Sequence, residues 1–137
     1  VDVVDVVTRS RMMAGIRGRD TRPELRVRRY LHAAGLRFQL DATGIPGRPD
    51  VVFRGRRIAL FVHGCFWHQH EGCRFATMPL TRAEFWTSKF ESNKARDARV
   101  TGQLHDMGWM VLTIWECETR DIEALDRLVW CIHAADH

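Results

Sequence analysis

The sequence predicts an α/β domain in which helices pack on a mixed sheet. Two short apolar stretches, 50–53 and 58–62, flank the turn sequence Arg54-Gly55-Arg56 and predict a β-hairpin. A long helix and a third apolar strand, 109–115, are predicted to follow. Because a strand that follows a crossover helix is added in parallel, this pattern favours a layered α/β fold with a mixed sheet.

The segment before the hairpin is predicted to contain a helix and one more strand. Asp20 or Thr21 can cap this helix, and Gly35 ends it. Glu24 falls in the first turn, where the helix dipole favours a negative charge. Residues 36–40 read as extended and are predicted to join the sheet.

Two helices are predicted after the hairpin. Thr81 is expected to cap the long helix, which runs to about Met107 and is broken by Gly108. A closing helix is predicted from about Asp121 to Ala134. The predicted order is therefore helix, three strands, helix, strand and helix.

The length of the chain predicts a single domain, 1–137. Of its 137 residues, 45% are hydrophobic, which suffices for one well-buried core. No apolar run reaches the roughly 20 residues that span a bilayer. The first residues also lack the basic start and apolar stretch of a signal peptide. We therefore expect a cytoplasmic protein without a membrane partner.

Positive charge is concentrated near the start of the chain. The net charge is +4, and nine arginines but only two carboxylates lie between Thr8 and Arg37. A general preference for arginine codons would also raise the arginine count, but it would not cluster the arginines. Clustered positive charge is typical of a surface that binds the phosphates of nucleic acid.

Three of the four cysteines lie with a histidine in a pattern that suits a metal ion. Cys65, His70 and Cys73 fall within nine residues, and Cys117 follows the last predicted strand. Three thiolates and one imidazole suit tetrahedral Zn²⁺ in a structural site. Thiols packed as small hydrophobic groups are the alternative. Cys131, in the closing helix, is interpreted as a core residue.

A carboxylate and two histidines gather around the predicted hairpin. Asp50 follows Pro49 at the start of a strand, where its carboxylate can be one of the oxygen ligands that Mg²⁺ prefers. His63 and His68 follow the next strand and can transfer protons or stabilise charge on a phosphate. Glu24 can join them from the first helix. For both carboxylates a purely structural role is the alternative, as a strand start or a helix start.

Aromatic residues follow the same strand. Phe66 and Trp67 are adjacent in a polar loop, where burying both rings is difficult, and Trp86 lies in the long helix. Exposed aromatic rings beside a basic surface can stack on bases or wedge between them. Core packing is the alternative, and it is the default for Trp86.

Several short motifs together resemble the very short patch repair (Vsr) endonuclease family over nearly the whole chain. The most specific motif is His63-Gly64-Cys65-Phe66-Trp67-His68. The others are Thr8-Arg9-Ser10 with Ile16, Arg19-Asp20-Thr21, Pro46-Gly47-Arg48-Pro49-Asp50, Glu84-Phe85-Trp86, Asn93, Gly108-Trp109 and Trp115-Glu116-Cys117. The resemblance implies a restriction-endonuclease-like fold, a PD-(D/E)xK variant with a three-layer core, a mixed central sheet and a structural zinc site.

The resemblance also implies an activity. A member of this family is expected to nick one DNA strand 5′ of the T in a T:G mismatch, which arises when 5-methylcytosine is deaminated. The reaction would use Mg²⁺, and residues 1–19 would contact the double-stranded DNA. The enzyme is expected to be a monomer at the bacterial nucleoid, with mismatch-repair proteins as further partners.

Carried over to this sequence, the resemblance assigns individual roles. Asp50 and the backbone carbonyl of Val62 look like Mg²⁺ ligands. His63 and His68 look like the catalytic histidines, with Glu24 as the carboxylate partner of His68. The zinc ligands would be Cys65, His70, Cys73 and Cys117. DNA would be contacted by Met13, Phe66, Trp67, Trp86, Lys89 and Asn93, with the three aromatic rings intercalating.

Two positions depart from the family pattern. Val62 replaces a threonine, which removes a hydroxyl group but keeps the backbone carbonyl. Glu71-Gly72 lengthens the spacing from His70 to Cys73 by one residue. In addition, His63 stands where nucleases of this fold usually carry a lysine.

Two related functions fit the same residues. One is a nuclease for a different mismatch or sequence context, and the other is a zinc-stabilised DNA-binding module that does not cleave. The second is disfavoured because Asp50, Glu24, His63 and His68 occur together. A zinc deaminase is excluded, since no His-x-Glu is followed by Pro-Cys-x-x-Cys.

Overall fold

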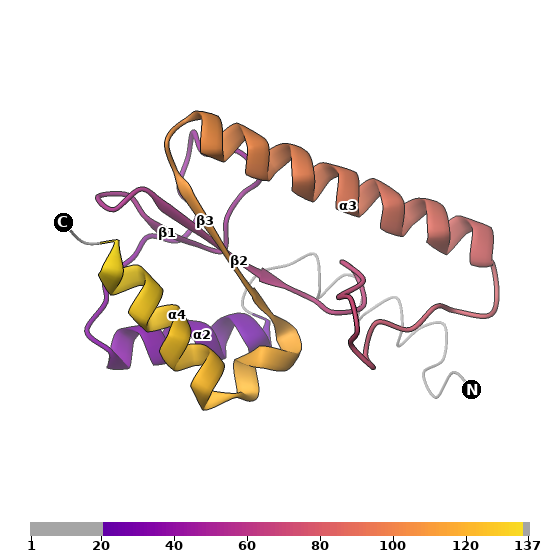
Figure 1. Ribbon diagram of the computed structural model, residues 1–137, viewed down its shortest axis with the longest axis horizontal. Coiled ribbons are helices and arrows are strands. Elements are labelled where there is room, and N and C mark those ends of the chain that lie inside the picture. The colour runs from indigo at the N-terminus through magenta and orange to yellow at the C-terminus, as the bar shows by residue number, and fades with distance from the viewer. Residues whose placement is uncertain (1–20, 136–137) are drawn as a thin grey trace.

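The computed structural model describes residues 21–135, and Figure 1 shows the arrangement of their helices and strands. In chain order the elements are α2 (Arg22–Ala33), β1 (Val51–Phe53), β2 (Ile58–His63), α3 (Ala83–Asp106), β3 (Met110–Trp115), the 3-10 helix η1 (Glu116–Arg120) and α4 (Ile122–Ala134). Within this part of the chain, none of the helices is long and apolar enough to cross a bilayer.

The three strands form a mixed sheet in the order β1-β2-β3. β1 and β2 are antiparallel, with Val51 opposite Leu60. β2 and β3 are parallel, with His63 opposite Trp115. The predicted hairpin and the predicted parallel strand are therefore confirmed. Because parallel strands end at the same edge of a sheet, the chain leaves β2 and β3 side by side.

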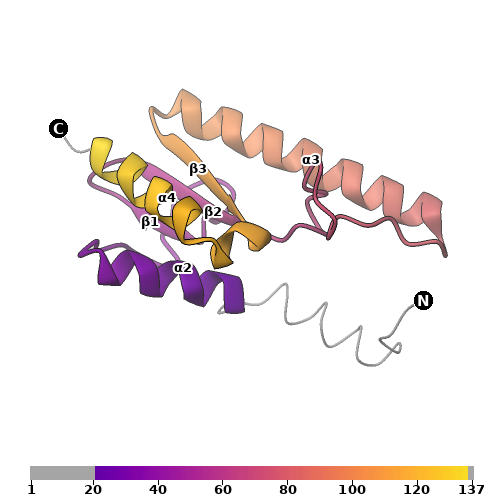
Figure 2. The ribbon, with the colours of Figure 1, turned by 60° about the horizontal axis from the view of Figure 1, so that its bottom comes forward.

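Helices α2 and α4 cover one face of the sheet (Figures 1 and 2). Successive residues of a strand point to opposite faces, so alternate strand positions supply the core on this side. This core consists of Val27, Leu31, Leu36, Val51, Phe53, Ile58, Leu60, Ile114, Leu125, Leu128 and Ile132.

Helix α3 lies on the opposite face of the sheet, which makes the fold layered on both sides (Figure 2). Leu104, near the end of α3, packs with Ile45, Val52 and Ala59. The first half of α3 extends past the ends of β2 and β3 and runs beside the loop that follows β2 (Figure 1). One helix therefore contacts both the sheet and this loop.

The helix ends show which local signals were reliable. Thr21 caps α2 as predicted, since its side chain accepts a hydrogen bond from the N–H of Glu24. Thr81 does not cap α3. The residue before that helix is Arg82, which has a φ of 57° and makes no side-chain cap bond. The closing helix predicted from about Asp121 to Ala134 is confirmed, and Asp121 caps it through the N–H of Glu123.

The remaining expectations differ from the structure or lie outside the residues that it describes. Residues 36–40 do not form a strand, because their pairing with the sheet is limited to an isolated bridge between Gln39 and Val52. The 3-10 helix η1 was not predicted. Met13 and the rest of the basic segment 1–19 lie outside the described residues.

Gly47 is required where the loop before β1 crosses α3. Its φ is +80°, and a Cβ atom there would lie 2.3 Å from Cγ1 of Val100. Gly47→Ala is therefore expected to lower the free energy of unfolding by roughly 3 kcal/mol, which chemical denaturation would measure. Gly44→Ala is the matched control, since Gly44 has a φ of +78° but no atom within 4 Å of the added Cβ. It should cost about 1 kcal/mol. Equal losses would show that the contact with Val100 is unimportant.

Candidate active site and metal centre

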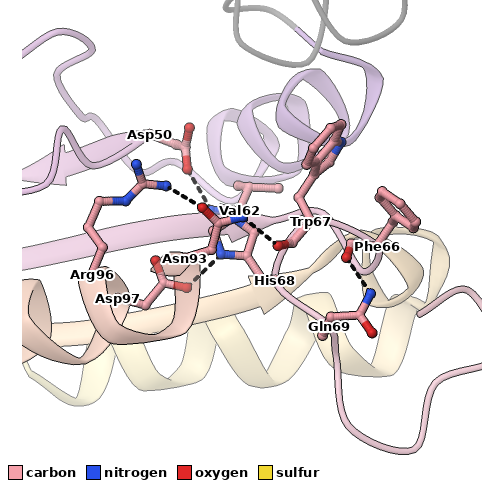
Figure 3. A network of polar contacts seen from close by, with 9 residues as sticks. All are labelled: Asp50, Val62, Phe66, Trp67, His68, Gln69, Asn93, Arg96 and Asp97. Atoms are coloured by element: carbon pink, nitrogen blue, oxygen red, sulfur yellow. Dashed lines mark hydrogen bonds and ion pairs between the residues drawn. The ribbon is translucent and has the colours of Figure 1, made fainter. Parts of the chain in front are cut away.

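Asp50 lies directly before β1 and faces the neighbouring strand. Its Oδ2 accepts a hydrogen bond from the backbone N–H of Val62 at 2.7 Å (Figure 3). Burial raises the pKa of the Asp50 carboxyl, the N–H of Val62 lowers it and the charge of Glu24 raises it again. Smaller effects of Arg28 and His68 lower it, and the resulting pKa is about 6. A poorly solvated carboxylate of this kind is stabilised by a neighbouring cation.

Glu24 adds a second carboxylate from the first turn of α2. The residue is buried, with 9% of its surface exposed. Its Oε2 forms an ion pair with a guanidinium nitrogen of Arg28 at 3.1 Å. Nδ1 of His68 pairs with a carboxylate of α3. The expectation that Glu24 is the carboxylate partner of His68 stays a prediction. Glu24 acts on the site through its negative charge near Asp50.

The carboxylate of α3 that pairs with Nδ1 of His68 is that of Asp97. Oδ2 of Asp97 lies 2.6 Å from Nδ1 of His68 (Figure 3). Burial raises the pKa of Asp97, but the hydrogen bond and the charge of His68 outweigh this effect, so the pKa is lowered. An ionised carboxylate can only accept a hydrogen bond. Nδ1 of His68 therefore carries the proton, and Nε2 of a neutral imidazole is left as an acceptor.

His63, the last residue of β2, stacks on His68. The ring centroids are 3.9 Å apart and the planes differ by 1°. Trp115 makes a T-shaped contact with His63 at a centroid distance of 5.2 Å, and its ring lies 6.3 Å from that of His68. Burial, and then the charge of His68, lower the pKa of His63 to about 4. His63 is therefore neutral at neutral pH and holds the neighbouring ring in place.

The protonation state of His63 can be measured by NMR. We expect its Cε1–H signal to stay constant as the pH falls from 8 to 5, since the pKa of its imidazole is about 4. In His68→Ala the midpoint is expected to rise, because a neighbouring positive charge is removed. A midpoint near the unperturbed value of about 6.5 in the unmodified protein would contradict the burial of this ring.

The aromatic residues form a cluster beside this site. The ring of Phe66 contacts Trp86 and Phe90 at centroid distances of 5.5 and 5.2 Å. Trp67 contacts Trp86 at 5.8 Å. Trp86 is 9% exposed, whereas Phe66 and Trp67 are half-buried. Trp86 therefore forms the base of the cluster, and the two loop residues lie above it.

Lys89 and Asn93, the other two residues of α3 expected to contact DNA, differ in exposure. Lys89 is half-buried. Asn93 is 6% exposed, and its Nδ2 donates to the backbone carbonyl of Trp67 at 2.9 Å (Figure 3). The amide of Asn93 thus makes a hydrogen bond within the protein, and its expected contact with DNA stays a prediction.

The three cysteines and the histidine predicted to bind zinc lie together. Nδ1 of His70 is 3.7 Å from Sγ of Cys65 and 3.5 Å from Sγ of Cys117. The parallel register explains the meeting of the two cysteines, since each lies two residues beyond the paired ends of β2 and β3. The ligand atoms of Cys65, His70, Cys73 and Cys117 all lie within 4.8 Å of one another.

The longer spacing between His70 and Cys73 does not separate the ligands. Gly72, within the added segment, has a φ of +74°, and Gln69 has a φ of +47°. Gly72 lies in a turn that is closed by a hydrogen bond from the N–H of Cys73 to the carbonyl of His70 at 3.2 Å, and this turn brings Cys73 back toward His70. The ring of Trp115 stacks on His70 at a centroid distance of 4.1 Å and so fixes the orientation of the imidazole.

The chemistry of the cluster fits a soft divalent cation. Burial raises the pKa of the Cys65 thiol to about 12 and also raises the pKa of Cys117. The backbone N–H of Phe75 lowers the pKa of Cys73. Two of the three sulfur atoms therefore need a neighbouring cation to be thiolates, and a set of three sulfurs and one nitrogen is typical of structural zinc.

The sequence of the chain is similar to those of several known proteins. A family model described as DNA mismatch endonuclease Vsr matches residues 1–74. The chain is 48% identical over 115 residues to the type II nicking enzyme V.XorIIP of Xanthomonas oryzae pv. oryzae, which covers 84% of each chain. It is 44% identical over 124 residues to DNA mismatch endonuclease Vsr of Escherichia coli (strain K12), covering 90% of this chain and 79% of that protein. A third relative, the type II nicking enzyme V.NmeAIP of Neisseria meningitidis, is 33% identical over 132 residues, 93% of this chain and 94% of its own.

Proposed function

Because the chain belongs to the Vsr family of DNA mismatch endonucleases, we propose that it nicks one strand of duplex DNA 5′ of the T in a T:G mismatch, with Mg²⁺ as its cofactor. The observation that carries this proposal is the arrangement of Asp50 and the His68–Asp97 pair around the end of β2. A carboxylate for a metal ion and an imidazole that can accept a proton are the groups that phosphodiester hydrolysis needs.

The cation would be held by oxygen ligands. Asp50 and the backbone carbonyl of Val62 would bind Mg²⁺, which favours oxygen and keeps several waters. The buried, negatively charged surroundings of Asp50 and Glu24 fit a cation there. When bound, the ion neutralises the scissile phosphate and stabilises the leaving oxygen.

The protein side chains carry the proton transfer. As a water oxygen bonds to phosphorus and the P–O3′ bond breaks, Nε2 of His68 accepts the proton of that water. Asp97 stabilises the imidazolium through its hydrogen bond to Nδ1, which lies at 2.6 Å. His63 stacks on His68 and, because its pKa is about 4, adds no positive charge that would oppose this protonation.

Mismatch recognition is proposed for the aromatic cluster. Phe66 and Trp67 are half-buried and precede His68 directly, so a base step opened by these rings would place the strand near the imidazole. The rings of Phe66 and Trp67 would thus form a wedge. Trp86 would support this wedge from below, and Lys89 would face the phosphates. Met13, within the basic segment 1–19, would enter from the opposite groove.

The cysteine cluster is proposed to bind structural Zn²⁺. Cys65, His70 and Cys73 come from the loop after β2, and Cys117 comes from η1. A closed site with four ligands would fix the loop that carries Phe66 to His68 against the end of β3. The metal would thus order the wedge and the catalytic histidine without taking part in the reaction.

We also propose the wider context of the protein. The layered sheet would be a PD-(D/E)xK-type core in which His63 replaces the usual lysine, and residues 1–137 would form one domain. The protein would act as a monomer on DNA in the bacterial cytoplasm, at the nucleoid and with mismatch-repair proteins.

A strand-specific nicking assay tests the function. Duplexes with one T:G pair in varied flanking sequences are compared with fully paired duplexes, each with and without Mg²⁺. Mg²⁺-dependent nicking 5′ of the mismatched T is the expected result. Tight binding without cleavage under all conditions would support a DNA-binding module instead, and cleavage at another mismatch would support a related nuclease.

A further inference from the structure

Four residues on one face of α3 contact the loop that follows β2. They are Trp86, Phe90, Asn93 and Asp97, and their spacing of four, three and four residues places them along one stripe of the helix. Trp86 and Phe90 contact the ring of Phe66. Asn93 and Asp97, the two polar residues of the stripe, contact the next residues of the same loop, Trp67 and His68.

Asn93 holds the peptide group that joins Trp67 to His68. Its Nδ2 donates to the carbonyl oxygen of Trp67 at 2.9 Å, and Arg96 donates to its Oδ1 at 3.3 Å (Figure 3). The contact with Arg96 fixes which end of the amide faces the carbonyl. Asp97, one turn later, holds the imidazole of His68. The same stretch of helix therefore fixes both the peptide and the ring of His68.

We propose that Asn93 is a positioning residue that couples the wedge to the catalytic imidazole, an inference that rests on the proposed function. The carbonyl of Trp67 belongs to the peptide unit that begins His68. A backbone rotation that carries the ring of Trp67 into a duplex therefore also turns His68, and the amide of Asn93 sets the extent of that turn.

The effect of such a turn on the rate is large. A displacement of about 1 Å at a catalytic group can change a rate by roughly 100-fold. Asn93 is 6% exposed, so water does not readily replace the bond from its amide. Through the hydrogen bond of Asn93, insertion of Trp67 at a mismatch would determine how well His68 is aligned.

The first test follows the Nδ1–H signal of His68 by NMR in the full chain without Mg²⁺, so that no strand is cut. Adding a duplex with one T:G mismatch is expected to shift this signal more than a paired duplex does. Trp67→Ala and Asn93→Leu are expected to remove the difference. Ser92→Leu, the same new side chain at an exposed neighbouring position, is expected to keep it.

The outcomes separate this inference from the proposed function. A signal in the unmodified protein that responds equally to both duplexes overturns the coupling, and so does an unchanged response in Asn93→Leu. A mismatch-dependent shift in a chain that never nicks DNA would support the coupling and contradict the proposed reaction. If leucine disturbs folding, Asn93→Ser replaces it, since serine is smaller and its hydroxyl is too short to reach the carbonyl.

Single-turnover nicking gives a second readout. Asn93→Leu is expected to lower the rate by roughly 10- to 100-fold while duplex affinity and the pH profile stay unchanged, because the amide does not titrate. Adding Trp67→Ala to Asn93→Leu is expected to cost little more, since both changes break one link. If the rate loss of the double variant equals the product of the two single losses, the proposal is overturned. A loss of duplex affinity as large as the loss of rate would also overturn it.

Discussion

Asp50→Asn is expected to lower the nicking rate by roughly 10³-fold or more while leaving the duplex bound. The amide has nearly the same shape as the carboxylate but lacks the negative charge that would hold Mg²⁺. Removing a negative charge beside a bound phosphate also favours DNA binding, so affinity should be unchanged or higher. Strand-specific nicking and a gel mobility-shift assay measure the two quantities separately.

A matched control for this change is Asp106→Asn. Asp106 is an exposed residue at the end of α3, and its substitution removes the same charge away from the site. It is expected to nick at the rate of the unmodified protein. Near-normal nicking by Asp50→Asn would remove this carboxylate from the mechanism. A joint loss of nicking, binding and melting temperature would assign it a structural role.

The elevated pKa of Asp50 also gives the pH dependence a definite sign. The ionised carboxylate binds the cation, and its pKa is about 6, so at limiting Mg²⁺ the rate is expected to fall as the pH decreases through this value. Metal binding favours the ionised form, and a higher Mg²⁺ concentration should therefore shift the acid limb to lower pH. An acid limb that does not move with Mg²⁺ would belong to another group.

Cys117→Ser is expected to release the bound zinc and to lower the free energy of unfolding by roughly 3 kcal/mol or more. Cys117 is the ligand most distant in sequence, and it links η1 to the loop after β2. Without it, the three remaining ligands, Cys65, His70 and Cys73, lose the fourth ligand of a closed site. Zinc content per chain and chemical denaturation measure the loss.

Cys131→Ser is the control for the chemical change alone. Cys131 was predicted to be a core residue, and it is half-buried in α4, outside the metal cluster. Its substitution should change the free energy of unfolding by about 1 kcal/mol and leave the zinc content at one ion per chain. If the unmodified protein contained no zinc and Cys117→Ser were equally stable, the cluster would be three thiols packed without a metal.

The fold was predictable where the signal was local. The hairpin at 54–57, the cap Thr21 and the apolar pattern of β3 are short-range features, and the structure contains all three. Residues 36–40 were predicted wrongly because an extended pattern does not show whether a partner strand is available. Arg82 precedes α3 with a φ of 57°, a left-handed conformation that could not be predicted from an arginine.

The candidate site was also predictable only where the signal was local. The motif around Cys65 predicted the cluster of cysteines and histidine, and the Pro-Asp motif indicated Asp50. Asp97 was missed because its role depends on which face of α3 meets the loop, and that is decided by tertiary packing. The spacing of Trp86, Phe90 and Asn93 marks this face and could have indicated it.

During synthesis on the ribosome, the candidate active site of this protein cannot form until β3 has left the exit tunnel. The last residue of β2, His63, pairs with Trp115, so the sheet edge stays open while the whole of α3 is still being made. Cys65 meets Cys117 later still. The candidate site can therefore form only after nearly the whole chain, including all of α3 and β3, has been synthesised.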